Sequence, residues 1–95
     1  MAHTFDELVA KQRAADEAHA RVRQLQETYG PPTQTKWSEH QTATWETAWR
    51  AWRDLARDAQ VAVSEYARQE NTPRHEIETR VKQAVRHEGP DTPEP

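Results

Sequence analysis

The sequence has no cysteine, only two glycines and few aliphatic side chains. Without cysteine there is no disulfide framework, no thiol nucleophile and no Cys-ligated zinc site. With two glycines, a glycine-rich loop that cradles phosphates is effectively excluded. Leu, Ile, Val and Phe make up 11 of 95 residues, a share at which chains begin to look disordered. Disordered chains usually also carry a high net charge, however, and this one carries only −3.

Long hydrophobic runs are also missing. No stretch approaches about 18 consecutive apolar residues, and the opening residues, MAHTFDE, have neither the basic nor the apolar region of a secretory signal. We therefore expect a soluble cytoplasmic protein with no membrane partner. A pI near 5.9 argues against a protein whose whole surface grips a phosphate backbone, although it leaves room for a local basic patch.

The chain has instead four tryptophans and a regular helical spacing of apolar residues. A few large rings take the place of the missing aliphatic residues as the source of buried area. Apolar or small residues recur in alternating steps of three and four along two segments, with Lys11 as the one break. The first stripe is Leu8, Ala15, Ala18, Val22, Leu25 and Tyr29, and the second is Trp45, Trp49, Trp52, Ala56, Ala59, Val63 and Tyr66. This pattern predicts an all-α protein.

Start and stop signals divide the chain into three helices. Thr4 to Glu7 and Ser38 to Gln41 match the capping box, in which two side chains satisfy each other's backbone N–H groups. Gly30-Pro31-Pro32 and Asn71-Thr72-Pro73 are stop signals, and in the second Thr72 and Pro73 can also start the next helix. We predict helices at about 4–29, 38–70 and 73–87 in one domain, 1–88, followed by a disordered acidic, proline-rich tail, 89–95.

The first two helices are expected to form an antiparallel hairpin. Aligning the two stripes sets Ala18 opposite Trp49 and Ala15 opposite Trp52, so that small residues face large ones. The second helix then extends beyond the start of the first, and the third can fold back to cover that overhang with Ile77 and Val81. Its four apolar residues barely offset the cost of ordering it. Two outcomes stay open: docking on the hairpin, or a helix that is mobile or docks only in an assembly.

A two-helix hairpin cannot cover both the Trp stripe and the neighbouring flank of Ala48, Ala51, Leu55 and Ala62. We therefore predict a homodimer that completes a helical bundle, with a different protein partner as the main competitor.

No residue pattern points to catalysis, so we expect a protein that is not an enzyme and has no cofactor or metal site. Asp16 and His19 share a helical face, but a carboxylate-bridged metal site in a bundle needs a second such unit, which the second helix does not offer. Ser38 and Ser64 have no usable base beside them. A thin bundle of this size also seldom encloses a substrate pocket.

The function that the sequence favours is a small α-helical interaction module, an adaptor, accessory or regulatory subunit, that self-associates. Its candidate contact residues are Trp37 at the hairpin tip and Leu55, Arg50, Arg53 and Arg57 on the second helix. If the three Trp of the stripe are internal, Trp37 is left as the exposed ring.

A nucleic-acid-binding regulator is the first alternative. Between residues 66 and 87, a small residue, a turn, a cap and an apolar anchor fall near the positions that a helix-turn-helix requires. Arg74, Arg80, Lys82 and Arg86 would then contact the nucleic acid. The match is partial, because Glu70 occupies a position that is usually apolar and Val81 falls one residue late.

The helical hairpin and the segment Tyr66-Ala67-Arg68-Gln69-Glu70 support a second alternative. This chain resembles the WXG family of small type VII secretion substrates, whose partners can carry a Tyr-x-x-x-Asp/Glu signal after the hairpin. The resemblance implies a small secreted helical hairpin. The turn Tyr29-Gly30-Pro31-Pro32 departs from the family because it lacks the Trp-x-Gly motif.

Overall fold

A computed structural model describes residues 3–87 of the chain and contains three helices in this range. They are α1 (Phe5–Tyr29), α2 (Glu39–Gln69) and α3 (Arg74–His87), with no strand among the described residues. The all-α prediction is confirmed, and each helix begins and ends within one residue of its predicted bounds. The predicted disorder of residues 89–95 lies outside the described residues.

Both long helices begin at the capping boxes that the sequence indicates. The Thr4 hydroxyl accepts from the Glu7 N–H at 3.1 Å, and Glu7 Oε1 accepts from the Thr4 N–H at 2.9 Å. Ser38 and Gln41 make the same reciprocal pair at 3.0 and 2.9 Å. These bonds satisfy N–H groups that the first turn of a helix leaves without partners.

The end of α2 is a Schellman motif built on Asn71, whose φ is +54°. The Thr72 N–H donates to the Ala67 carbonyl at 2.9 Å, and the Asn71 N–H donates to the Arg68 carbonyl at 3.2 Å. The expected cap of α3 by the Thr72 side chain is different, because its hydroxyl donates to the Glu70 carbonyl at 3.1 Å. Thr72 therefore helps to close α2.

Asn71→Ala is expected to lower the free energy of unfolding by about 1 kcal/mol, because alanine is strained in the left-handed region. Asn71→Gly should leave the stability unchanged or raise it slightly, because glycine adopts the left-handed conformation without steric strain. Urea unfolding followed by circular dichroism compares the two variants. Equal stabilities for Asn71→Ala and Asn71→Gly would contradict a left-handed turn at this position.

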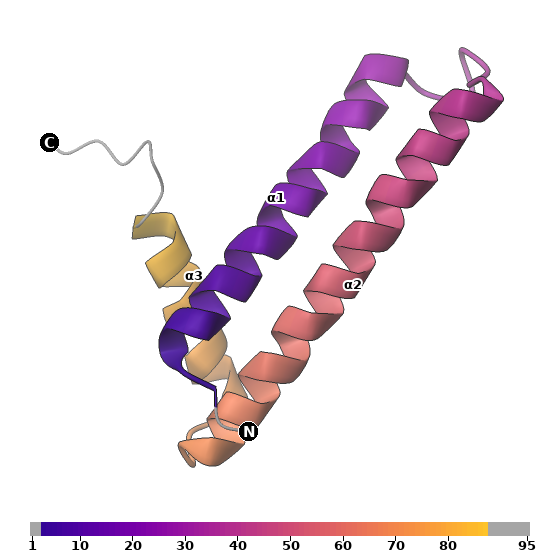
Figure 1. Ribbon diagram of the computed structural model, residues 1–95. Coiled ribbons are helices and arrows are strands. Elements are labelled where there is room, and N and C mark those ends of the chain that lie inside the picture. The colour runs from indigo at the N-terminus through magenta and orange to yellow at the C-terminus, as the bar shows by residue number, and fades with distance from the viewer. Residues whose placement is uncertain (1–2, 88–95) are drawn as a thin grey trace, which may run out of the picture.

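The hairpin is antiparallel, and α1 and α2 lie side by side along most of their length (Figure 1). The Lys11 ammonium lies 2.7 Å from the Asp58 carboxylate, and His3 Nε2 lies 2.6 Å from Glu65 Oε1. These two pairs lie within two residues of the predicted register. The ring of Trp52 also contacts that of His19, one helical turn beyond Ala15. The long His19 side chain reaches Trp52 across the seam between the helices.

The flank of α2 that carries Leu55 and Ala62 faces α1. Asp58 and Glu65, which reach α1 through their ion pairs, follow these two residues by three positions and lie on the same side of the helix. Ala62 is buried against Leu8 of α1. The sequence left this flank without a partner in the hairpin. The structure places its Leu55 and Ala62 on the side that faces α1, while Ala51 stays exposed.

The tightly packed core lies at the open end of the hairpin, where α3 folds back against both long helices (Figure 1). Leu8, Ile77 and Val81 are its largest fully buried side chains. The cluster consists of Leu8, Ala62, Val63, Ala67, Ile77 and Val81, with Phe5, Tyr66 and Val85 packed at its edge. Docking of α3 within a single chain decides between the two outcomes that the sequence left open.

The prediction that the Trp stripe forms the buried core is wrong for its first half. Trp45, Trp49 and Trp52 are only half-buried, whereas Ala59 and Val63 further along the same stripe are 2% exposed. The difference follows from α3, a helix of 14 residues beside one of 31. It is too short to cover the tip half of the hairpin.

Candidate interaction surface

α3 packs on only one half of its face of the hairpin. The other half, toward the tip, has no described helix packed against it. Arg74 of α3 contacts Gln60 and Ser64 of α2. About 11 residues make three helical turns, so Trp49 and Arg53 lie three turns earlier on the same side of α2. Neither of them is buried, and the described contacts of α3 with α2 do not include them. We call this uncovered region the aromatic groove; its residues are His19, Arg23 and Gln26 of α1, Trp37, and Trp45, Trp49 and Trp52 of α2.

The rings of the groove contact one another in a row. Trp37 packs edge-on against Tyr29 and Trp45, with ring centroids 5.3 and 5.9 Å apart. Trp45 and Trp49 are stacked at 6.1 Å, with 21° between their planes. His19 lies on Trp52 at 4.6 Å. Side chains held by such contacts are ordered before any ligand arrives, which lowers the entropic cost of binding.

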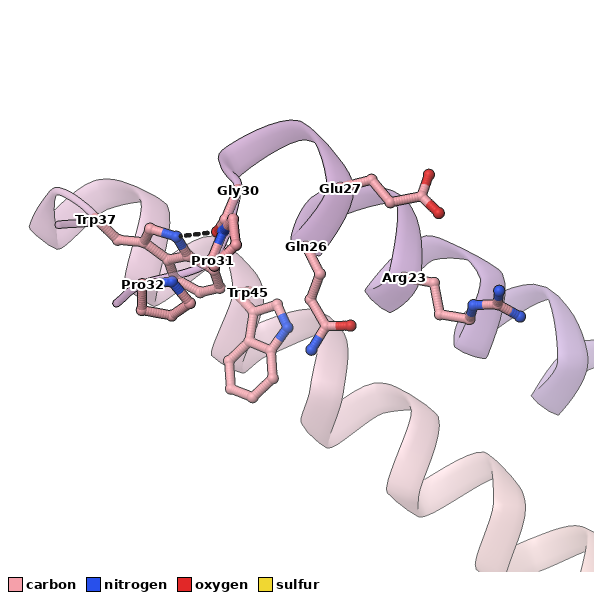
Figure 2. Close-up of a pocket in the computed structure, with 8 residues that line it drawn as sticks. All are labelled: Arg23, Gln26, Glu27, Gly30, Pro31, Pro32, Trp37 and Trp45. Carbon is pink, nitrogen blue, oxygen red and sulfur yellow. Dashed lines mark hydrogen bonds between the residues drawn. The ribbon is translucent and has the colours of Figure 1, made fainter. Parts of the chain in front are cut away.

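The tip end of the groove is hollowed into a cavity of about 690 Å³. Its residues come from three places: α1, the tip loop and the first turns of α2 (Figure 2). They are Arg23, Gln26, Glu27, Gly30, Pro31, Pro32, Trp37 and Trp45. A volume of this size lies in the range of small ligand sites.

Trp45, one of the residues that line this cavity, carries an unsatisfied donor. Its Nε1 atom is buried and has no hydrogen-bond partner within residues 3–87. Figure 2 shows the nitrogen edge of the ring turned toward the side chain of Gln26, which is exposed. A buried indole N–H normally has an acceptor, so this donor is an unsatisfied polar group inside the packed tip of the hairpin.

Trp37 is part of the packed tip and not a free ring at its end. Its Nε1–H donates to the Gly30 carbonyl at 2.8 Å, which links the start of α2 to the end of α1. The ring is half-buried between Tyr29 and Trp45. The interpretation of Trp37 as the ring left out of the aromatic packing is therefore wrong, although one side of it lines the cavity.

The other predicted contact residues do not all lie on one surface. The Arg53 guanidinium lies over the ring of Trp49, 4.8 Å from its centroid, and forms one edge of the groove. Arg50 and Arg57 are exposed one turn to either side of Arg53. Leu55 is half-buried on the flank that faces α1. The structure thus brings Trp37 and Arg53 to one surface and places Leu55 elsewhere.

The cations of α3 are divided between internal contacts and solvent. Arg74 donates to Gln60, Ser64 and Glu78, and Arg80 lies 3.8 Å from the Glu76 carboxylate. Lys82 and Arg86 are exposed and border a small cavity with Gln12, Asp16 and Val85.

The carboxylates of Asp58 and Asp16 each accept a hydrogen bond from a side chain of α1. Asp58 accepts from Lys11, and this hydrogen bond raises the pKa of Lys11 above its ordinary value. Asp16 accepts from Gln12 at 2.9 Å, while His19 stacks on Trp52. Residues 3–87 contain no group of three His, Asp or Glu side chains that could hold a metal ion.

Arg23 and Gln26 were not identified from the sequence, and His19 was considered only beside Asp16 as a metal ligand. The signal was present, since His19 lies three turns after Leu8 and Gln26 two turns after His19, on one side of α1. Their polar character placed them among solvent-facing residues. Only the short length of α3 turns this side of α1 into one wall of a groove.

Comparison with known proteins finds no family model that matches this chain, no similar curated protein and no similar solved structure. Within the segment that resembles the WXG-family signal, the Tyr66 ring packs on Phe5 at 6.2 Å and Ala67 is buried. In addition, no described helix is long and apolar enough to cross a membrane. What the fold and the surface define is a three-helix protein with an aromatic groove.

Proposed function

We propose that this protein is a small non-enzymatic interaction module that forms a homodimer through its aromatic groove. The observation that carries the proposal is that one face of the hairpin is buried unequally. α3 buries the half at the open end, whereas the three Trp residues of the other half remain only partly buried. A second hairpin laid on this half would complete a helical bundle.

The composition of the groove supports this role. Tryptophan and arginine are enriched among the residues that dominate binding energy at protein interfaces. Here the Arg53 guanidinium lies over the Trp49 ring at the edge of the groove, so a tryptophan and an arginine are in contact on this surface. On the other side of α2 the surface is ordinary, with Val61 as the exposed large hydrophobic residue at 48%.

Trp49→Ser is expected to raise the dissociation constant of the dimer by more than about tenfold, because it removes a central ring from the interface. Sedimentation equilibrium over a range of micromolar concentrations measures this constant. Val61→Ser is the matched control, since it removes an exposed apolar side chain from the opposite side of the same helix. Circular dichroism checks that both variants remain folded.

Two results would contradict the proposal. One is a folded monomer at high micromolar concentration in the unmodified protein. The other is an equal loss of association in Trp49→Ser and Val61→Ser, which would place the interface away from the groove. Affinity capture from the native host tests for a partner of different sequence. Such a partner should bind the unmodified protein and Val61→Ser but not Trp49→Ser.

Nucleic-acid binding through α3 is not the function we favour. Arg74 and Arg80 are paired with Glu78 and Glu76, which lowers the charge that α3 offers to phosphates. A fluorescence anisotropy titration with duplex DNA at low salt distinguishes the two functions.

The cytoplasmic location also remains a prediction from the sequence, and fractionation of the native host tests it.

A further inference from the structure

The face of the hairpin that carries the aromatic groove has a step in it. At the open end α3 lies on this face, and Val63 of α2 is buried there in one cluster with Ile77 and Val81 of α3 (Figure 1). Toward the tip the face ends at the half-buried rings of Trp45 and Trp49. An α-helix with its side chains is about 10 Å across, so the covered half stands about 10 Å above the open half. A second copy has to fit this step.

Two identical copies related by a two-fold axis can lie face to face in two ways. With both tips at the same end, α3 of one copy lies against α3 of the other, and the open halves are held about 20 Å apart, too far for indole rings to meet. With the copies turned end for end, the two open halves lie against each other, and each α3 lies beside the tip of the other copy. Only the end-for-end arrangement buries the aromatic groove.

A row of charged and polar residues follows the groove along the outer edge of α2. Its members, spaced by seven residues or about two helical turns, are Glu39, Glu46, Arg53 and Gln60. The Arg53 guanidinium lies over Trp49, and the Gln60 side chain accepts from Arg74 of α3, so the row borders the face that carries the groove. We call these four residues the charged row. It is acidic toward the tip and basic at Arg53.

The order of charges in this row favours the same arrangement. End for end, the two α2 helices lie antiparallel on each other, so their charged rows run in opposite directions along one edge of the dimer. Arg53 then lies opposite the partner's Glu46, and Glu46 lies opposite the partner's Arg53. With both tips at the same end, α2 lies against α1 of the second copy, and the two rows are on opposite edges. Charges at such edge positions set the orientation of paired helices.

Glu46 and Arg53 have no competing ion pair. Both side chains are exposed, and neither pairs with an opposite charge among residues 3–87. The contact with the Trp49 ring holds the Arg53 guanidinium at the edge of the groove, which lowers the entropic cost of a further contact there. These two side chains are therefore suited to pair between copies.

We propose that the aromatic groove takes a second copy turned end for end, and that ion pairs between Arg53 and the partner's Glu46, formed twice by symmetry, fix this orientation. The inference rests on the proposed function, because it specifies how the two grooves meet. The rings supply the buried area, and the charged row sets the register. A shift that placed Glu46 opposite the partner's Glu46 would bring like charges together, which is unfavourable at an interface.

Arg53→Glu and Glu46→Arg should each raise the dissociation constant of the dimer about tenfold, because each places like charges opposite each other at two symmetric positions. An equimolar mixture of the two variants should associate about as tightly as the unmodified protein, since both pairs of the mixed dimer again have opposite charges. Sedimentation equilibrium, at a concentration where each variant alone is monomeric, measures this recovery. Arg21→Glu is the matched control, because it makes the same change of charge beside Ala43 and Thr47, on the other face of the hairpin.

Two results would overturn the inference. One is a mixture that stays as dissociated as the separate variants, and the other is an equal dissociation constant for Arg53→Glu and Arg21→Glu. Either result leaves the proposed function standing if Trp49→Ser still weakens the dimer, because the groove is then buried in another orientation. If Trp49→Ser and Val61→Ser behave alike, the proposed function fails and the inference fails with it. Circular dichroism confirms that each variant is folded.

Discussion

Ile77→Ala is expected to lower the free energy of unfolding by about 3 kcal/mol. Ile77 is fully buried, at 0% exposure, between the two long helices and the rest of α3. Truncation removes apolar contacts from all three helices and leaves a cavity that the short α3 cannot close by a small shift. With 14 residues, α3 is near the length at which an isolated helix is marginal in water, so it depends on this contact.

Urea unfolding followed by circular dichroism at 222 nm measures the loss. Lys82→Ala is the matched control, because it shortens an exposed side chain on the same helix and should change stability by less than about 0.5 kcal/mol. The native ellipticity is a second readout, since release of α3 lowers helix content while α1 and α2 stay paired. If Ile77→Ala and Lys82→Ala are equally stable, α3 does not dock in solution.

Trp37→Ala is expected to lower the free energy of unfolding by about 2 kcal/mol. Fully buried aromatic residues cost about 3 to 5 kcal/mol when truncated, and this ring is half-buried. The variant also removes the hydrogen bond from Nε1 to the Gly30 carbonyl, which joins the two ends of the hairpin tip. The sequence alone led to a different expectation, an exposed ring left out of the aromatic packing.

Trp37→Phe separates the two contributions. It keeps an aromatic ring against Tyr29 and Trp45 but has no donor for Gly30, so it should cost about 1 kcal/mol, the usual net value of one hydrogen bond. Both variants are measured by denaturant unfolding. A Trp37→Ala variant as stable as the unmodified protein would show that the ring does not hold the tip together.

The two substitutions probe the two halves of one surface. Ile77 belongs to the half that α3 closes, and Trp37 to the half that it leaves open. The open half is held by ring contacts, by the buried side chains of Val22 and Leu25 and by one indole hydrogen bond, and it keeps an unsatisfied donor at Trp45. We infer that the first half supplies most of the stability, and we propose that the second supplies the binding surface.

Local signals in the sequence predicted the helices closely. The capping boxes at Thr4 and Ser38 involve groups three residues apart, so their hydrogen bonds form wherever the helix forms. Asn71 was recognised as a stop signal because few other residues accept a left-handed conformation. Fold class and helix bounds depend on such short-range interactions.

The candidate surface was predicted only in part. The Trp stripe and the neighbouring arginines were identified, and Arg53 and Trp49 do meet at the groove. Leu55 was included although it lies on the flank facing α1, and His19 was omitted although it lines the groove. Spacing defines which residues share a helix face, but it does not say which of two adjacent apolar faces meets the partner helix.

The sequence by itself determined three helices, their caps, the hairpin and an aromatic stripe, because each of these follows from residues within a few turns of one another. Only the tertiary structure decided that α1 packs on the flank with Ala62, and that α3 closes the half of the hairpin around Val63 and leaves the half around Trp49 open. The physical reason is that the burial of a helix face depends on which other helix packs against it, and this is a non-local property. It depends on the length and direction of α3, which no residue of the Trp stripe encodes.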